Sequence, residues 1–143
     1  MACKLTAETV MEAVHKTMEG PFVRGVSDCC TAACQAFGEV WGEDPLGPVE
    51  YRTAIGAARF LLPYGGIDGC AKAIAARAGL VLGDAAPGAL GVIRHQAAAT
   101  SDPELSRGWV MGICVDGRTW AIKGEHGFIL AEFDLQGWRP KWA

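Results

Sequence analysis

Apolar residues recur at helical spacing in the first half of the chain. The first such segment follows Thr6, which can cap a helix, and its apolar residues Val10, Val14 and Met18 lie four positions apart. The Gly-Pro pair at 20–21 then interrupts the pattern. We therefore expect one amphipathic helix at the start of the chain.

The second helical segment begins near Ser27 and runs to about Trp41. Ser27 offers a side-chain oxygen that can cap the helix, and Asp28 places negative charge in the first turn. One apolar stripe along this helix consists of Cys30, Cys34, Phe37 and Trp41. The pattern predicts a helix that packs against the core.

Two shorter helices are predicted before the middle of the chain. The third spans residues 53–62 and is ended by Pro63. For the fourth helix, Asp68 can serve as the cap, the helical pattern continues through Ala78, and Gly79 is the C-terminal stop.

From residue 80 onward, β-branched and aromatic residues and turn signals replace the helical pattern. The pair Asp116-Gly117 predicts a hairpin with a two-residue type I′ turn, which needs positive φ at both positions. The polar stretch 96–107 predicts an exposed loop. Strands are expected near Ala89 to Arg94, Trp109 to Val115, Arg118 to Ile122 and Phe128 to Phe133, with a further candidate from Gly137 to Trp142.

Helices followed by a meandering antiparallel sheet are typical of an α+β domain in which the helices pack on one side of the sheet. With 143 residues, half of them hydrophobic, the chain can bury one core, so we expect a single domain over residues 1–143. Its parts are an N-terminal helix in 1–20, a helical half in 21–79 and a β-rich half in 80–143.

The composition of the chain argues against several classes of function. A net charge of -3 with scattered basic residues argues against nucleic acid as a ligand. The first 20 residues mix charged and apolar positions, unlike a signal peptide, and no window approaches 18 consecutive apolar residues, so no membrane-spanning helix is expected. Most of the six cysteines are expected to be reduced, buried, small apolar residues, since no export signal is recognised.

Cys29 is the candidate for chemistry. A thiol in the first turn of a helix lies where unpaired backbone N–H groups and the helix dipole favour the thiolate, which is the attacking species of a cysteine nucleophile. The same N–H groups can stabilise an oxyanion. Geometry favours Cys29 over Cys30 for this role. The alternative interpretation is that Cys29, Cys30 and Cys34 all serve core packing, since free cysteine is among the most buried residue types.

A metal site is another interpretation of the cysteines. Cys30 and Cys34 are four residues apart on one helix face, and Cys3, Cys70 or a histidine could complete a set of ligands. No CxxC pair occurs, however, and core packing produces the same spacing. We therefore expect neither a metal nor another cofactor.

The segment PFVRGVSDCCTAACQAF resembles the nucleophile helix of the NlpC-type cell-wall cysteine peptidases, which have a papain-like fold. The order of several motifs over residues 20–142 resembles more closely a family of small phage and prophage proteins of that fold: the Asp-Cys-Cys start, DPLGPVEYRTAIGAARFLLPYGG, PGALGVIR, MGICVDGRTWAIKGEHGFIL and a terminal Trp-containing strand. The resemblance implies a papain-like domain with Cys29 in the nucleophile position and Asp28 in a supporting role. It also implies a place in the tail-tip region of a tailed phage or of a phage-derived gene transfer particle.

The chain departs from the family pattern at the position of the catalytic histidine. NlpC-type enzymes typically carry it in a His-Val-Gly-Ile-like run at the start of a strand, and the comparable position here holds Val110. His126, in the turn after the predicted hairpin, is the first candidate for a substitute base; His95 and His15 are the others. For each of the three, a solvated surface histidine is the competing interpretation.

Two functions follow from the resemblance. The first is a degenerate peptidase fold kept as a structural or adaptor component of a phage tail tip, with other tail-tip or hub proteins as partners. The second is an active cysteine endopeptidase or amidase that cleaves peptidoglycan stem peptides during cell entry, with Cys29 as nucleophile and His126 as base. In both, the protein would be made in the cytoplasm of a bacterial host and located in the virion tail.

Overall fold

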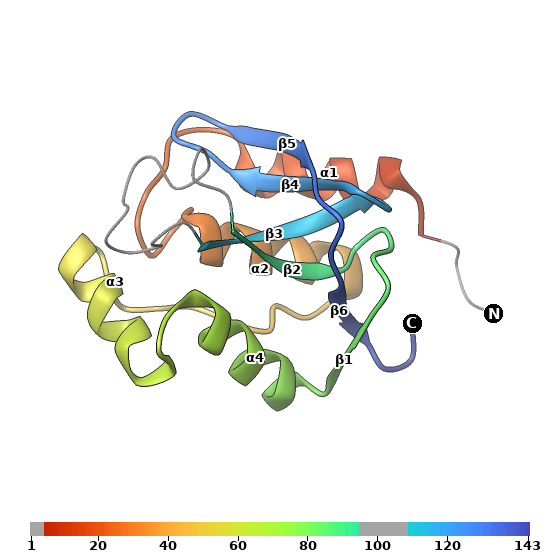
Figure 1. Ribbon diagram of the computed structural model, residues 1–143. Coiled ribbons are helices and arrows are strands. Elements are labelled where there is room, and N and C mark those ends of the chain that lie inside the picture. The colour runs from red at the N-terminus through yellow and green to blue at the C-terminus, as the bar shows by residue number, and fades with distance from the viewer. Residues whose placement is uncertain (1–4, 95–108) are drawn as a thin grey trace.

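The computed structural model of the protein describes residues 5–94 and 109–143 (Figure 1). His95 and the predicted loop 96–107 lie outside the described residues. The helices and strands of these residues form an α+β fold, which confirms the predicted class. No helix of the described part is long and apolar enough to cross a membrane.

The four predicted helices are present, with small changes at their ends. They are α1 (Ala7–Met18), α2 (Cys29–Trp41), α3 (Ala54–Leu61), followed by the short 3-10 helix η1 (Leu62–Tyr64), and α4 (Ile67–Ala78).

Side-chain caps are found at the starts of three helices, α1, α2 and α3, and two of the predicted caps are wrong. Thr6 Oγ1 accepts the N–H of Thr9 at the start of α1, as expected. The cap of α2 is Asp28 and not Ser27, because Asp28 is the last extended residue and its carboxylate accepts the first-turn N–H groups. The cap position of α4 is Gly66, so that Asp68 lies within the first turn.

Within the described residues, six strands form one antiparallel sheet in the order β1-β6-β2-β3-β4-β5. The first of them was not predicted, since its four residues show no alternation of buried and exposed positions. The strands are β1 (Leu80–Gly83), β2 (Leu90–Arg94), β3 (Trp109–Asp116), β4 (Thr119–Lys123), β5 (Phe128–Glu132) and β6 (Gly137–Pro140).

The predicted hairpin joins β3 and β4, but its turn is one residue later than expected. Asp116 pairs with Thr119, so the turn residues are Gly117 and Arg118. The register shifts between Cys114 and Asp116, which is the signature of a β-bulge. The bulge places Asp116 in the strand, where the sequence pattern placed it in the turn.

One face of the sheet packs against the helices. In Figure 1, α1 and α2 lie behind the sheet, and α4 lies below and contacts β1, β2 and β3. The Nζ of Lys123, at the end of β4, donates to Met18 O at 3.0 Å and Gly20 O at 2.6 Å, so this side chain points toward α1. Side chains alternate along strands, so Ala121 and its partner Ile113 share that face.

Trp120 is buried on the opposite face, since it alternates with Ala121 along β4. The connection from β5 to β6 crosses in front of this face in Figure 1. A Cβ atom added at Gly91 would lie 2.5 Å from the indole of Trp120, and one at Gly137 would lie 3.1 Å from it. Glycine at these two positions therefore makes room for the buried indole.

Candidate functional site around Asp28 and Cys29

A tight turn leads the chain into α2. Val23 and Ser27 form an isolated antiparallel bridge, with Ser27 N donating to Val23 O at 2.7 Å. Between them, Gly25 has a φ of +77°, and a Cβ at this position would lie 1.9 Å from Tyr51 O. Only glycine meets both conditions, because it tolerates positive φ and needs no space for a side chain.

The carboxylate of Asp28 is fully buried and accepts five hydrogen bonds. Its Oδ1 accepts from Cys30 N at 3.0 Å, Thr31 N at 2.8 Å and Thr31 Oγ1 at 3.0 Å. Its Oδ2 accepts from Gly25 N at 2.9 Å and Tyr51 Oη at 2.7 Å. Five donors around one carboxyl group match the ionised form, which only accepts hydrogen bonds. Asp28 therefore joins the Gly25 turn, the start of α2 and the segment that carries Tyr51.

Tyr51 was not singled out in the sequence, although it lies in one of the motifs that carry the resemblance. Burial, with the nearby Asp28 carboxylate as a second cause, raises the pKa of the Tyr51 phenol well above its ordinary value. The hydroxyl thus stays protonated and donates to Asp28. No local signal could have revealed this contact, because the two residues are 23 positions apart.

The hydrogen bonds of Asp28 also decide which backbone groups of α2 remain available. The N–H groups of Cys30 and Thr31 are taken by Asp28 Oδ1, and the N–H of Ala32 donates to Asp28 O at 2.9 Å. Within this described first turn, that leaves the N–H of Cys29 without a protein acceptor. An oxyanion at the start of α2 would therefore meet one helix N–H and not several.

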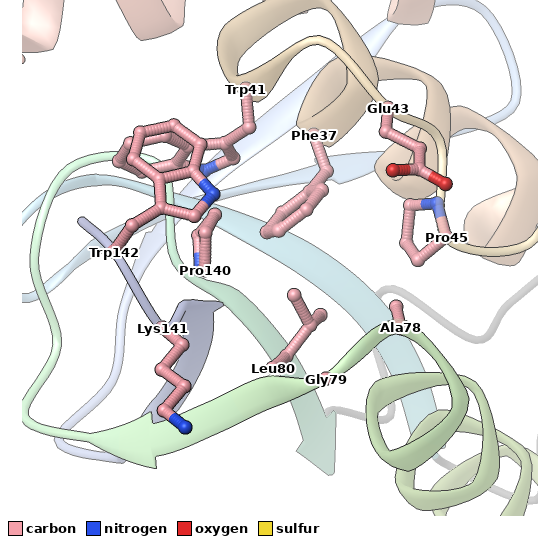
Figure 2. A pocket seen from close by; sticks show the side chains of 10 residues that line it. All are labelled: Phe37, Trp41, Glu43, Pro45, Ala78, Gly79, Leu80, Pro140, Lys141 and Trp142. Carbon is pink, nitrogen blue, oxygen red and sulfur yellow. The ribbon is translucent and has the colours of Figure 1, made fainter.

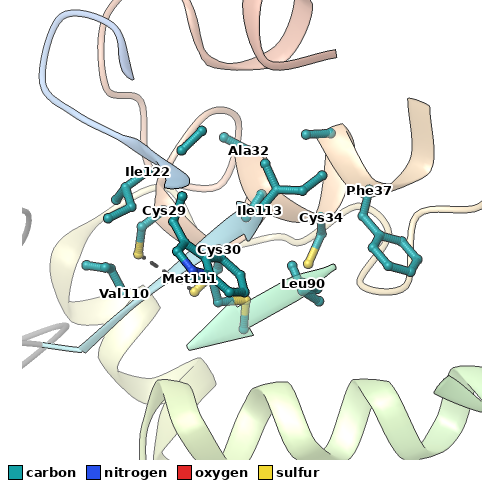
Figure 3. Packing of buried hydrophobic residues seen from close by; sticks show 14 of the residues in the cluster. Cys29, Cys30, Ala32, Cys34, Phe37, Leu90, Val110, Met111, Ile113 and Ile122 are labelled. Atoms are coloured by element: carbon teal, nitrogen blue, oxygen red, sulfur yellow. Dashed lines mark hydrogen bonds between the residues drawn. The ribbon is translucent and has the colours of Figure 1, made fainter. Parts of the chain in front are cut away.

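Cys29 lies in the first turn of α2, as expected, and is the first residue of the helix, but it is packed into the core. It is 4% exposed, and its Sγ lies 3.9 Å from the Sγ of Cys30 (Figure 3). The hydrogen bond with Cys29 and then burial raise the pKa of the Cys30 thiol well above its ordinary value. Burial likewise raises the pKa of Cys34. Cys30 and Cys34 are therefore protonated packing residues at neutral pH.

No histidine of the described residues forms a hydrogen bond with the thiol of Cys29. The His126 side chain is 91% exposed, and its Nε2 lies 3.9 Å from Glu125 Oε2. His15 bonds to Glu19 through Nδ1 and makes an edge contact with Phe128. His95 lies outside the described residues. The structure thus brings Asp28 together with Cys29 and leaves His126 in the solvent.

Val110, which occupies the position of the family's histidine, is 1% exposed and lies on β3. It is two residues from Gly112, which pairs with Ile122, so these three share a face of the sheet. That face is opposite to the one on which Lys123 reaches α1. The regular alternation of β3 therefore places Val110 on the sheet face opposite to that of Lys123.

Among residues 5–94 and 109–143, no group of three or more histidine, cysteine or acidic side chains is placed to hold a metal ion. Cys3, one of the ligands considered above, lies outside these ranges. Cys30 and Cys34 instead belong to the same buried cluster as Cys70. The spacing of four residues here reflects the side of the helix that faces the core.

A family model described as a domain of unknown function, DUF6950, matches residues 4–143. No curated protein matches the chain. No solved structure matches it either.

Proposed function

We propose that the chain, which belongs to the DUF6950 family, is a non-catalytic relative of the NlpC-type papain-like peptidases. Its proposed role is that of a structural or adaptor component of a phage tail tip. The order of motifs along the sequence supports the relationship. A helix that opens with Asp28-Cys29 and packs on an antiparallel sheet is compatible with the papain-like fold.

The observation that carries the non-catalytic role is the environment of Cys29. The residue is 4% exposed, and no imidazole of the described residues bonds to its sulfur. A missing general acid typically costs about 10² to 10⁴ in rate. A buried sulfur also cannot reach the carbonyl of a peptide in solution.

Asp28 supports the same conclusion. In a catalytic arrangement a carboxylate can orient the histidine that serves the nucleophile. Here both oxygens of Asp28 are filled by donors from the protein itself, so the carboxylate has a structural role.

One observation favours the second candidate function, an active peptidase acting on peptidoglycan stem peptides. The free N–H of Cys29 lies next to its own thiol, where it could donate to an oxyanion. For this function the sulfur would have to become exposed and gain a base.

The test of activity is incubation of the reduced, purified protein with peptidoglycan fragments. The matched control is Cys29→Ser, and an active NlpC-type peptidase shows that the fragments can be cleaved. We expect no peptide release by mass spectrometry from either the protein or its variant. Release by the protein that is lost in Cys29→Ser would refute the non-catalytic role and support the second function.

The tail-tip role needs a separate experiment. Particles induced from the bacterium that encodes the chain are purified and separated into head and tail fractions. We expect mass spectrometry to find the chain in the tail fraction. Its absence from intact particles, together with its presence in the cytosol, would refute the virion assignment whatever the activity assay shows.

A further inference from the structure

A cavity lies at the end of α2 opposite to Cys29, between that helix and the first and last strands of the sheet (Figure 2). Its volume is about 130 Å³, whereas sites for drug-sized ligands measure roughly 300–1,000 Å³. The space therefore suits one side chain of a partner better than a cofactor. It is lined by Phe37, Trp41, Glu43, Pro45, Ala78, Gly79, Leu80, Pro140, Lys141 and Trp142, and we call it the aromatic cavity.

Three aromatic rings form one side of the aromatic cavity. The rings of Trp41 and Trp142 meet edge to face with centroids 5.6 Å apart, and Phe37 lies 6.2 Å from Trp41. The indole N–H of Trp41 donates to Gly88 O at 2.9 Å, which holds this ring in place. Trp142, in contrast, is 73% exposed. A large exposed indole beside a cavity is typical of a protein contact site.

Two charged residues stand at the rim of the aromatic cavity, and neither forms an ion pair or hydrogen bond with another described residue. In Figure 2, the carboxylate of Glu43 lies beside Pro45 on the side of Phe37, and the amino group of Lys141 extends away from the three rings. The carboxylate therefore lies on the Phe37 side of the aromatic cavity, and the ammonium group is directed away from its aromatic side.

We propose that the aromatic cavity is the anchor site for one arginine side chain presented by a partner protein. The faces of aromatic rings carry negative charge density, so they attract a cation. A guanidinium group is planar, stacks on aromatic rings and pairs with a carboxylate, and the lining of the aromatic cavity offers both aromatic rings and the carboxylate of Glu43. Arginine and tryptophan are also the residues that most often dominate protein interfaces. The inference goes beyond the proposed function and does not require the phage assignment.

The probe for this site is N-acetyl-L-arginine N-methylamide, titrated into the ¹⁵N-labelled protein and followed by NMR. We expect saturable shifts of the indole N–H signals of Trp41 and Trp142, whereas the signal of the buried Trp120 stays in place. The Trp142→Phe variant assigns the Trp142 signal by removing it. The corresponding lysine, leucine and glutamate derivatives serve as competitors.

The two charged residues provide variants of opposite sign. Glu43→Gln is expected to weaken binding of the arginine probe about two- to fivefold, as for an exposed ion pair. Lys141→Gln is expected to strengthen it by a smaller factor, because it removes a like charge. Glu50→Gln, an exposed glutamate outside the cavity, is the matched control and should change nothing.

Three results would overturn the proposal. They are the absence of saturable shifts with the arginine probe, stronger binding of the leucine or glutamate derivative, and equal binding by Glu43→Gln and the unmodified protein. None of these results bears on peptidase activity or on location in a virion, so the proposed function is judged by its own experiments.

Discussion

Replacing the buried carboxylate of Asp28 by an amide should destabilise the fold by about 3 kcal/mol. In Asp28→Asn, an oxygen can stay at the Oδ1 position, where three donors converge. The amide NH₂ group must then replace Oδ2, where it faces the N–H of Gly25. Two donors facing each other in the interior cost about 1–3 kcal/mol.

The remaining bonds also weaken. Each of the three bonds to the retained oxygen loses its charge assistance, at about 1 kcal/mol each. The Tyr51 hydroxyl can rotate and accept from the new NH₂ group, so that contact is kept in a weaker form. Removal of a buried charge recovers part of its desolvation penalty, which brings the net loss back to about 3 kcal/mol.

The assay is urea unfolding at pH 7, followed by circular dichroism and extrapolated to zero denaturant. Asp84→Asn, an exposed aspartate, is the control and should stay within about 0.5 kcal/mol of the unmodified protein. Tyr51→Phe alone should cost about 2 kcal/mol, since it removes a hydrogen bond to a charged group. In the Asp28→Asn background, the same change should cost about 1 kcal/mol less.

Two results would refute this account of Asp28. One is a loss of less than about 0.5 kcal/mol in Asp28→Asn, which would mean that neither the charge of the carboxylate nor its acceptor facing Gly25 N contributes net stability. The other is full additivity of the Asp28 and Tyr51 variants, which would show that the two side chains do not interact.

Three further predictions concern the surroundings of this site. Gly25→Ala should destabilise the protein by several kcal/mol more than Gly20→Ala in the same urea assay. Both residues have positive φ, but only at Gly25 would an added Cβ meet a backbone oxygen, at 1.9 Å. Equal losses in the two variants would contradict this prediction. Lys123→Met should cost about 2–4 kcal/mol, since it leaves three carbonyl groups without their donor, whereas Lys72→Met on the exposed side of α4 should be neutral. Burial raises the pKa of the Cys114 thiol from 9.0 to about 11. The stability that the buried neutral thiol contributes is therefore complete below pH 9 and is lost as the pH rises toward 11. The free energy of unfolding, measured from pH 8 to 11, should decline less steeply in Cys114→Ala than in the unmodified protein, and parallel curves would contradict this prediction.

The start of α2 shows how much local sequence determines. A polar residue that can cap, followed by apolar residues at helical spacing, predicted the helix within one residue of where it begins. The prediction chose Ser27 over Asp28, because both side chains can cap and the choice depends on which one turns toward the helix. In the structure the Ser27 hydroxyl donates to Thr17 O at 3.4 Å, a contact from another element.

The strands show the same limit. Those in the centre of the sheet, β2 to β4, carry buried apolar runs that the sequence displays. The edge strand β1 does not, because what makes it a strand is pairing with β6, more than fifty residues later. Neither segment contains that information alone.

Caps, helical periodicity and turn glycines are local signals. The sequence by itself therefore determined the order of the helices, the position of Cys29 in the first turn of α2 and the hairpin of β3 and β4. Tertiary structure decided what surrounds that cysteine. The burial of its sulfur and the contact of Tyr51 with Asp28 arise from segments far apart in the chain. So does the aromatic cavity between Trp41 and Trp142. Such contacts depend on how whole elements pack, and no pattern within one element encodes them.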